Sequence, residues 1–230
     1  MPILSAQETE TMADSLIQKP KRKKPITLRG GIDLYGSVRS QVDDQFSGFE
    51  WVTDVNLTDD LYIAAEVGTV ERTIQSEQIN FTADGSYIKL GIDYNMYENW
   101  KGMDNQVYIG IRFARSTHAL KVNNYVLYTT DHFFDQNPIA SGYSSGSRTG
   151  LTAQWLEVIA GVKTAIVKNI YLGFSLRLNV LMSDTQPTDF DNLYIPGFQK
   201  VTDENRFGIG FNYTLTYALP LRLGKKSITP

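Results

Sequence analysis

Few residues in this chain could perform chemistry, because it contains two His and no Cys. Ser116 and His118 stand two positions apart, so they share one face if the segment is a β-strand. A histidine can activate a serine hydroxyl as a nucleophile, which would suit hydrolysis of a lipid ester. No acid stands at a fixed spacing to orient this histidine, and Asp131-His132 makes no better case. We therefore expect polar loop residues at both places and no catalytic site.

A group of acids late in the chain is the second candidate. It consists of Asp184, Asp189, Asp191, Asp203 and Glu204. Carboxylates are the ligands that Ca²⁺ prefers, but no calcium-loop spacing is present, so we expect solvated acids and no metal site. The lack of Cys excludes disulfides, thiolate chemistry, Cys-ligated zinc and a lipidated Cys. The net charge of -3 argues against a nucleic-acid partner, and nothing predicts a cofactor.

The elements that would position these residues are long segments with a period of two. In 206–221, large apolar residues at every odd position from 207 to 219 alternate with Gly, Asn, Thr and Ala. This alternation predicts a β-strand that exceeds the roughly 9–11 residues needed to cross a bilayer. The same pattern predicts strands at about 26–39, 48–57, 61–73, 86–95, 105–115, 153–164, 170–182 and 206–221. No helical periodicity is evident, and Asn123-Asn124 is predicted to form a hairpin turn.

Eight such strands predict an all-β fold, an eight-stranded antiparallel up-and-down β-barrel. A lumen of this size holds only modest side chains or one small ligand, so the bulky apolar set must face outward, toward lipid. The barrel is then a transmembrane one, without a wide pore. Charges on the small and polar face must be paired inside the lumen, and Arg39 shares this face. The predicted lumen charge network consists of Arg29, Asp33, Glu50, Asp54, Glu66, Arg72, Lys89, Asp93, Arg112, Glu157, Lys163 and Arg177.

The connections predict how the barrel is oriented. Short turns at 58–60 and 165–169 alternate with longer loops at 40–47, 74–85, 115–152 and 183–205. Outer-membrane barrels have short periplasmic turns and longer outer loops, so both termini are expected in the periplasm. We predict three parts. They are an export remnant with a disordered basic periplasmic tail (1–25), the barrel (26–221) and a short periplasmic C-terminal tail (222–230).

The chain resembles the small eight-stranded outer-membrane barrels of the OmpA-transmembrane and OmpX kind. The runs RGGIDLYG (29–36) and FGIGFNYTLTYALPL (207–221) look like an outer-membrane family of the Bacteroidota. The resemblance implies a Gram-negative outer membrane, contact with its lipids, and folding by the outer-membrane assembly machinery. That machinery reads a last-strand signal, whose spacing fits Arg206, Gly208, Phe211 and Tyr213. The signal usually ends the chain, whereas Gly224 to Pro230 follow it here.

Three functions follow from these patterns. The first is a non-enzymatic structural or interaction subunit, with protein partners in a larger outer-membrane assembly. The second is a surface adhesin or ligand binder that uses loops 115–152 and 183–205, and the least favoured is a lipid hydrolase using Ser116 and His118. Loop aromatics could form a binding surface, or could equally pack the loops together or lie at the membrane surface. These aromatics are Tyr125, Tyr128, Phe133, Phe134, Phe190, Tyr194 and Phe198.

Overall fold

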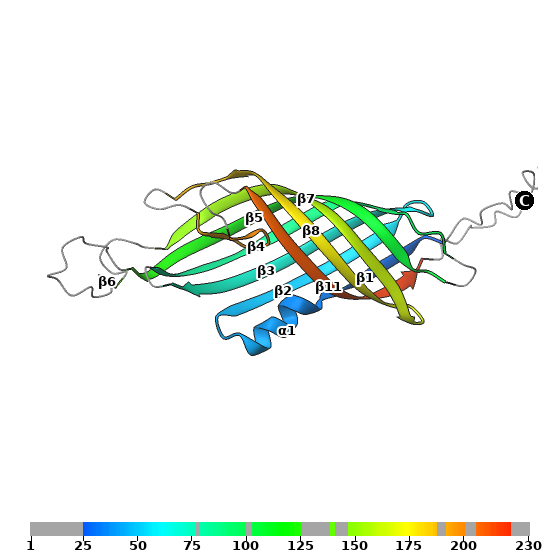
Figure 1. Cartoon of the computed structure of the whole chain (residues 1–230), viewed down its shortest axis with the longest axis horizontal. Helices are drawn as coiled ribbons and strands as arrows, with labels where there is room; N and C mark the ends of the chain where they lie inside the picture. Colours follow the sequence, from blue (N-terminus) through cyan, green and yellow to red (C-terminus); the bar gives the residue numbers. More distant parts are fainter. Residues whose placement is uncertain are drawn as a thin grey trace, which may run out of the picture.

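Eight antiparallel strands pair around a ring in the order β1, β2, β3, β4, β5, β7, β8 and β11, so the predicted all-β, up-and-down antiparallel barrel is confirmed (Figure 1). The computed structural model describes residues 25–76, 79–99, 103–125, 139–140, 147–187, 192–200 and 206–221. The ring strands are β1 (Thr27–Asp33), β2 (Phe46–Asn56), β3 (Leu61–Gln75), β4 (Ile79–Asn95), β5 (Gln106–Tyr125), β7 (Arg148–Val167), β8 (Ile170–Asp184) and β11 (Phe207–Pro220). The short β6 (Ile139–Ala140) pairs with β5, while β9 (Tyr194–Ile195) and β10 (Gln199–Lys200) form a separate hairpin.

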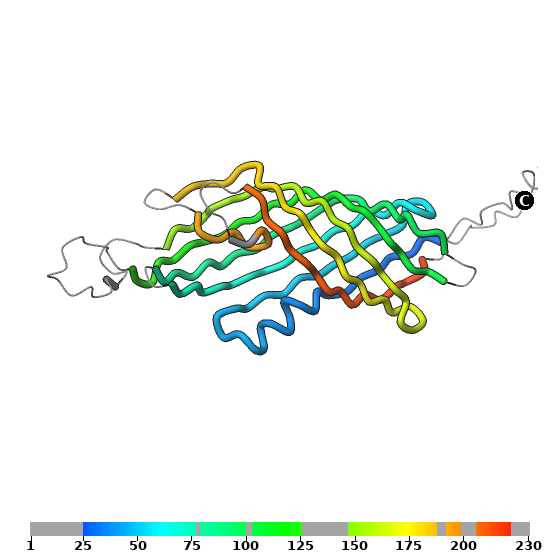
Figure 2. The backbone as a smooth tube through the Cα atoms, in the orientation of Figure 1, coloured from blue at the N-terminus to red at the C-terminus, as the bar shows by residue number. Residues whose placement is uncertain are grey.

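One end of the ring carries the tight turns, the start of the first strand and the end of the last strand. β7 and β8 are joined by Lys168 and Asn169, and Asn169 adopts a φ of 65°, a left-handed conformation that Asn tolerates. The first and last ring strands close at the same end, where Thr27 pairs with Pro220 (Figure 2). The predicted pairing of the opening and closing strands is therefore correct at this end.

The other end of the ring extends much farther than the sequence pattern predicted. Most of the predicted loop 74–85 is strand, because β3 and β4 pair as far as Gln75 and Asn80. The hairpin turn predicted at Asn123-Asn124 is wrong, since β5 runs through it and Asn124 pairs with both Asn80 and Ala140. The residues at the start and end of predicted loop 115–152 are also strand.

The cause is an inversion of the alternating pattern along β3, β4 and β5. Beyond the middle of the barrel the inward residues become apolar, and Phe81, Ala83 and Leu120 are buried. The outward residues become polar, and Glu71 and Asp84 are exposed. The alternation therefore continues, but with apolar residues inside and polar residues outside. A search for apolar residues on the outer face alone thus underestimates the length of these strands.

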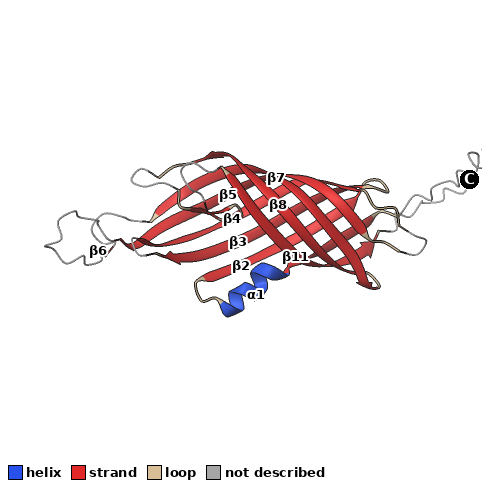
Figure 3. Cartoon of the chain, viewed as in Figure 1, coloured by secondary structure: helices blue, strands red, loops and turns tan. Residues whose placement is uncertain are grey.

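A helix, α1 (Leu34–Val42), takes the place of the second half of predicted strand 26–39, so the expectation of no helix was wrong. Asp33 begins it as the N-cap, and its carboxylate accepts a hydrogen bond from the backbone N–H of Gly36. Tyr35, Val38 and Val42 are exposed at helical spacing, the signal that could have predicted it. Figure 3 shows α1 lying along the strands. In the described part of the chain, no helix is both long and apolar enough to cross a membrane.

Candidate functional site

A small group of charges fills the lumen near the tight turns. Asp54 accepts hydrogen bonds from Arg29 Nε and Lys163 Nζ, each at 2.6 Å. Arg29 also donates through a second nitrogen to Gln106 Oε1 at 2.9 Å. All four side chains are buried. Such a group is stable only because each buried charge faces an opposite charge and further hydrogen bonds.

A larger group lies in the middle of the lumen, around Arg177. This guanidinium donates to Glu66 at 2.6 Å and to Glu157 at 3.1 Å. Lys89 Nζ lies 3.2 Å from Glu157 and 3.4 Å from Glu50. Strands that are distant in the sequence therefore meet through side chains across the lumen, rather than only through the backbone ladder.

Arg112 and Asp93 extend this middle group along the neighbouring strands. Two nitrogens of Arg112 donate to the two oxygens of Asp93 at 2.8 and 2.9 Å, which is the strong bidentate geometry. Gly110 makes this possible, because a Cβ there would collide with the Asp93 carboxylate. The two lumen groups together contain five acids and five bases, so they are neutral as a set. They are Arg29, Glu50, Asp54, Glu66, Lys89, Asp93, Arg112, Glu157, Lys163 and Arg177.

Two members of the predicted network lie elsewhere. Asp33 caps α1, and its second oxygen accepts a hydrogen bond from the Tyr213 N–H at 3.1 Å. Arg72 stacks on the ring of Tyr194 at 5.4 Å, outside both lumen groups. Arg39, which shares the alternation of this face, belongs to α1 and pairs with Asp43 at 2.9 Å. The helix changes the direction of the side chains after Asp33, which removes Arg39 from the lumen face.

We expect Arg177→Met to reduce the free energy of unfolding by about 3–5 kcal/mol, because the buried Glu66 and Glu157 would lose the guanidinium group that they share. Equilibrium unfolding by urea in lipid vesicles, followed by tryptophan fluorescence, measures this change. The matched control is Arg115→Met on the exposed outer face of β5, with an expected change below about 0.5 kcal/mol. Equal losses in the two variants would contradict a stabilising network.

Above the charges, aromatic side chains connect the polar lumen to an apolar interior. Tyr87 donates its hydroxyl to Glu50 at 2.7 Å, and Trp155 donates its indole N–H to Glu157 at 2.7 Å. Their rings belong to a buried apolar cluster that also includes Ile195 and Phe198. Aromatic residues with one polar atom suit this boundary, because the ring packs while the polar atom completes the network.

The segment around β9 and β10 closes the outer end of the lumen from inside. Tyr194 and Phe198 are 3% and 1% exposed, and the Phe198 ring packs edge-on against Trp155 with centroids 5.8 Å apart. Burial raises the pKa of the Tyr194 phenol, although the adjacent Arg72 opposes the shift, so the hydroxyl stays protonated at neutral pH. Tyr194 and Phe198 therefore pack inside the barrel and do not form part of an exposed binding surface in this structure.

The other predicted loop aromatics divide into two sets. Tyr125 is half-buried at the end of β5, where it packs against the outermost apolar cluster. The remaining four lie outside the described residues. They are Tyr128, Phe133, Phe134 and Phe190.

We expect Phe198→Ala to loosen the inner segment, because removal of a buried Phe costs about 3–5 kcal/mol. Hydrogen exchange of residues 192–200 should rise strongly, while exchange of the lumen strands should change little. Phe113→Ala, on the outward, exposed side of β5, serves as the matched control and should leave residues 192–200 protected. Unchanged exchange in Phe198→Ala would show that the segment is held by other contacts.

Ser116 and His118 do lie together, but not as a working pair. Ser116 Oγ is 3.5 Å from His118 Nδ1, and His118 Nε2 is 3.1 Å from Asn192 Oδ1. Asn192 is therefore placed to orient the His118 ring. The sequence spacing did not reveal Asn192 as a candidate. However, Ser116 is 0% exposed, so its hydroxyl cannot reach a substrate in this structure. Asp131 and His132 lie outside the described residues.

Of the predicted acid group, only Asp184 is described, and it accepts hydrogen bonds from Gln186 and Asn192. Within the described ranges, no three His, Cys, Asp or Glu side chains are grouped in a way that could hold a metal ion.

The chain matches one protein family. Residues 2–224 match the family model described as Domain of unknown function (DUF6048). No curated protein matches the sequence.

Among solved structures, the chain is similar to several small barrels. The N-terminal β-barrel domain of Pseudomonas aeruginosa OprF is 11% identical with a TM-score of 0.42, over 86% of this chain and 100% of that one. Ail, the attachment invasion locus protein of Yersinia pestis, is 10% identical with a TM-score of 0.43, over 85% and 99%. Neisserial surface protein A is 11% identical with a TM-score of 0.38, over 85% and 96%. The fold described above rests on the strand pairing of this chain itself.

Proposed function

The chain belongs to the DUF6048 family, and we propose that it is an integral outer-membrane β-barrel with a non-enzymatic, structural or interaction role. The proposal rests on one observation, a ring of strands that is apolar outside and charged inside. In this role the barrel would be inserted by the outer-membrane assembly machinery, with Arg206, Gly208, Phe211 and Tyr213 as its signal. The tight-turn end, with both strand termini, would face the periplasm.

The outward faces of the strands carry a continuous belt of exposed apolar side chains. Val67, Leu90, Ile111, Leu176 and Phe211, from five strands, are each 43% to 53% exposed. A monomeric soluble protein rarely exposes an apolar patch above a few hundred Å², and this belt runs along the strands of the ring. Lipid is the surrounding that makes such a surface favourable.

The belt has a sharp outer edge. At this edge Thr69 pairs with Ser86, and Arg115 pairs with Gln154. Beyond this level the outer face is polar and the interior is apolar, as in a water-soluble protein. The level therefore fits the lipid–water boundary, and the strands above it fit a position outside the membrane.

The lumen fits a structural role better than transport. Among the described residues, the cavity between the two charge groups has a volume of about 20 Å³, bordered by Asp54, Lys163 and Arg177. This is roughly the space for one water molecule. The buried Phe198 and Ile195 cover the outer side. A solute would have to break ion pairs and displace a packed apolar cluster.

We expect the protein to fractionate with the outer membrane and to migrate differently on gels before and after heating. Reconstituted into planar bilayers, it should give no channel steps, because the lumen is filled. Recovery in the soluble fraction would contradict the membrane location. Stable ion conductance would contradict the non-transport role, and a lone monomer with no co-purifying protein would contradict a larger assembly.

A surface adhesin or ligand binder is the second candidate, favoured by the strands that continue past the apolar belt. They would carry the ends of loops 115–152 and 183–205 away from the membrane. Replacing residues 126–147 with a short Gly-Ser linker should then abolish binding to its target surface, while heat-modifiable migration is kept. Unchanged binding would reject this candidate.

A further inference from the structure

The barrel wall contains a seam between β2 and β11. The ladder between β1 and β11 ends at Asp33 and Thr214, and the ladder between β1 and β2 ends at Ile32 and Trp51. Both β2 and β11 continue past these points toward the outer end. In place of a strand, the space between Phe46–Glu50 and Phe207–Tyr213 is occupied by α1 (Figure 1).

Helix α1 is attached to both edges of the seam by a few specific contacts. Ser40 Oγ accepts a hydrogen bond from the Gly48 N–H at 2.7 Å, which holds the helix to β2. Asp33 accepts the Tyr213 N–H, and the Tyr35 ring packs against Phe211 with centroids 4.8 Å apart. The helix thus covers the seam through side chains, without the continuous backbone ladder of the rest of the wall.

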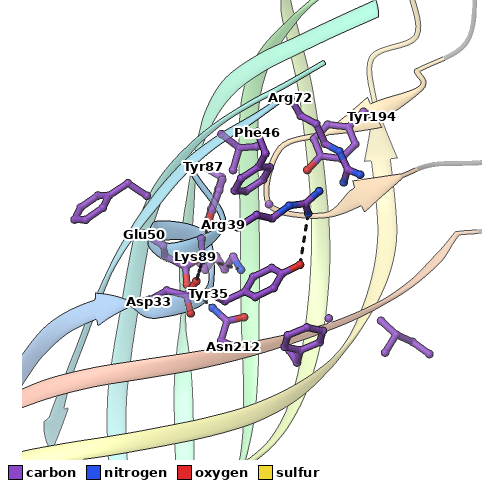
Figure 4. A pocket seen from close by; sticks show the side chains of 18 residues that line it. Asp33, Tyr35, Arg39, Phe46, Glu50, Arg72, Tyr87, Lys89, Tyr194 and Asn212 are labelled. Carbon is purple, nitrogen blue, oxygen red and sulfur yellow. Dashed lines mark hydrogen bonds and ion pairs between the residues drawn. The ribbon is translucent and has the colours of Figure 1, made fainter. Parts of the chain in front are cut away.

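A cavity of about 160 Å³ lies behind α1 and crosses the wall. Neighbouring residues whose side chains point to opposite faces of one strand both line this cavity. On β2 these are lipid-facing Phe49 and lumen-facing Glu50, and on β11 they are lipid-facing Phe211 and inward-facing Asn212. Two faces of one strand can border one space only where the edge of that strand is open. Figure 4 shows Glu50 and Asn212 among the side chains that line the cavity.

The charges that line this cavity favour an anion at its outer part. Lys89 is already shared among Glu50, Glu66 and Glu157, and Glu50 also accepts from Tyr87 and Asn212. The carboxylate of Asp33 is used by two backbone amides. The carboxylates of the lining are therefore already partnered.

Arg39 and Arg72 have fewer ion-pair contacts than Lys89, and both extend into the cavity (Figure 4). Arg72 contacts the Tyr194 ring, and no carboxylate of the described chain lies within ion-pair distance of it. Arg39 stacks on Phe46 and pairs with Asp43, but that pair is partly solvated and so is weak. Paired guanidinium groups are the preferred protein ligands of phosphate.

The depth of the cavity points to the source of the anion. Phe49 pairs with Thr69, the position on β3 where the apolar belt ends. The cavity thus lies at the level of lipid headgroups, with lipid-facing Ile209 and Phe211 at its open side. We propose that the seam binds a phosphorylated lipid from the outer leaflet, with Arg39 and Arg72 on the phosphate and an acyl chain leaving past Ile209 and Phe211. This inference rests on the proposed membrane location.

The test uses the full chain in nanodiscs of phosphatidylcholine with and without phosphatidic acid, and native mass spectrometry to count retained lipids. The wild type should retain phosphatidic acid selectively. Arg39→Gln/Arg72→Gln should weaken retention by about tenfold or more, because charge-assisted hydrogen bonds are lost. The control Arg115→Gln, an outward charge at the belt edge, should change nothing. Arg39→Lys/Arg72→Lys keeps both positive charges and should retain much of the lipid. This result would show that the loss in the Gln variant comes from the missing charges and not from misfolding.

Several outcomes would overturn the lipid site. These are no preference for phosphatidic acid, equal retention by the Gln and wild-type proteins, or an equal loss in Arg115→Gln. Binding of inorganic phosphate alone with the same affinity would show a free-anion site instead. Failure to insert into nanodiscs would contradict the membrane location itself, whereas insertion without lipid preference would contradict only this inference.

Discussion

The need to neutralise the charges that are buried in the lumen governs this structure. The two ion-paired groups place ten charged side chains, five of each sign, inside the ring. Each charge loses its water on folding, so each must face a partner at close range. This requirement decides which face of every strand points inward and why Gly110 must be small beside Asp93.

Much of the ring could be predicted from the sequence because the apolar outer face imposes one rule on every strand. Residues such as Ile88, Leu90 and Ile92 must be apolar at every second position, and that period is readable without a structure. The strand lengths could not be predicted in the same way. From Thr69, Ser86 and Arg115 toward the outer end of the strands, the outward residues are polar and the inward residues are largely apolar. The signal was present in the opposite phase, for example at Phe81 and Ala83.

The sequence could place a charge on the lumen face but could not choose its partner. Arg177 and Glu66 are 111 positions apart, and their contact depends on how strongly the strands are staggered around the ring. Alternation also failed at Asp33, where a strand becomes a helix. Leu34, Gly36 and Val38 fit the strand period, whereas Tyr35, Val38 and Val42 fit a helical one. The capping hydrogen bond from the Gly36 N–H to Asp33 stabilises the helix. The contact between Asn192 and His118 likewise required the fold, since 74 positions separate them.

The unequal strand lengths give the barrel an oblique outer rim. β5 has 20 residues and β2 has 11, and at about 3.3 Å per residue the difference is roughly 30 Å along the strand. On the α1 side the strands end early, so a neighbouring molecule there would meet the helix and the apolar belt. On the β5 side it meets an upright, polar sheet. In the proposed membrane setting, a protein that diffuses in the bilayer would therefore meet two chemically different sides of the same barrel.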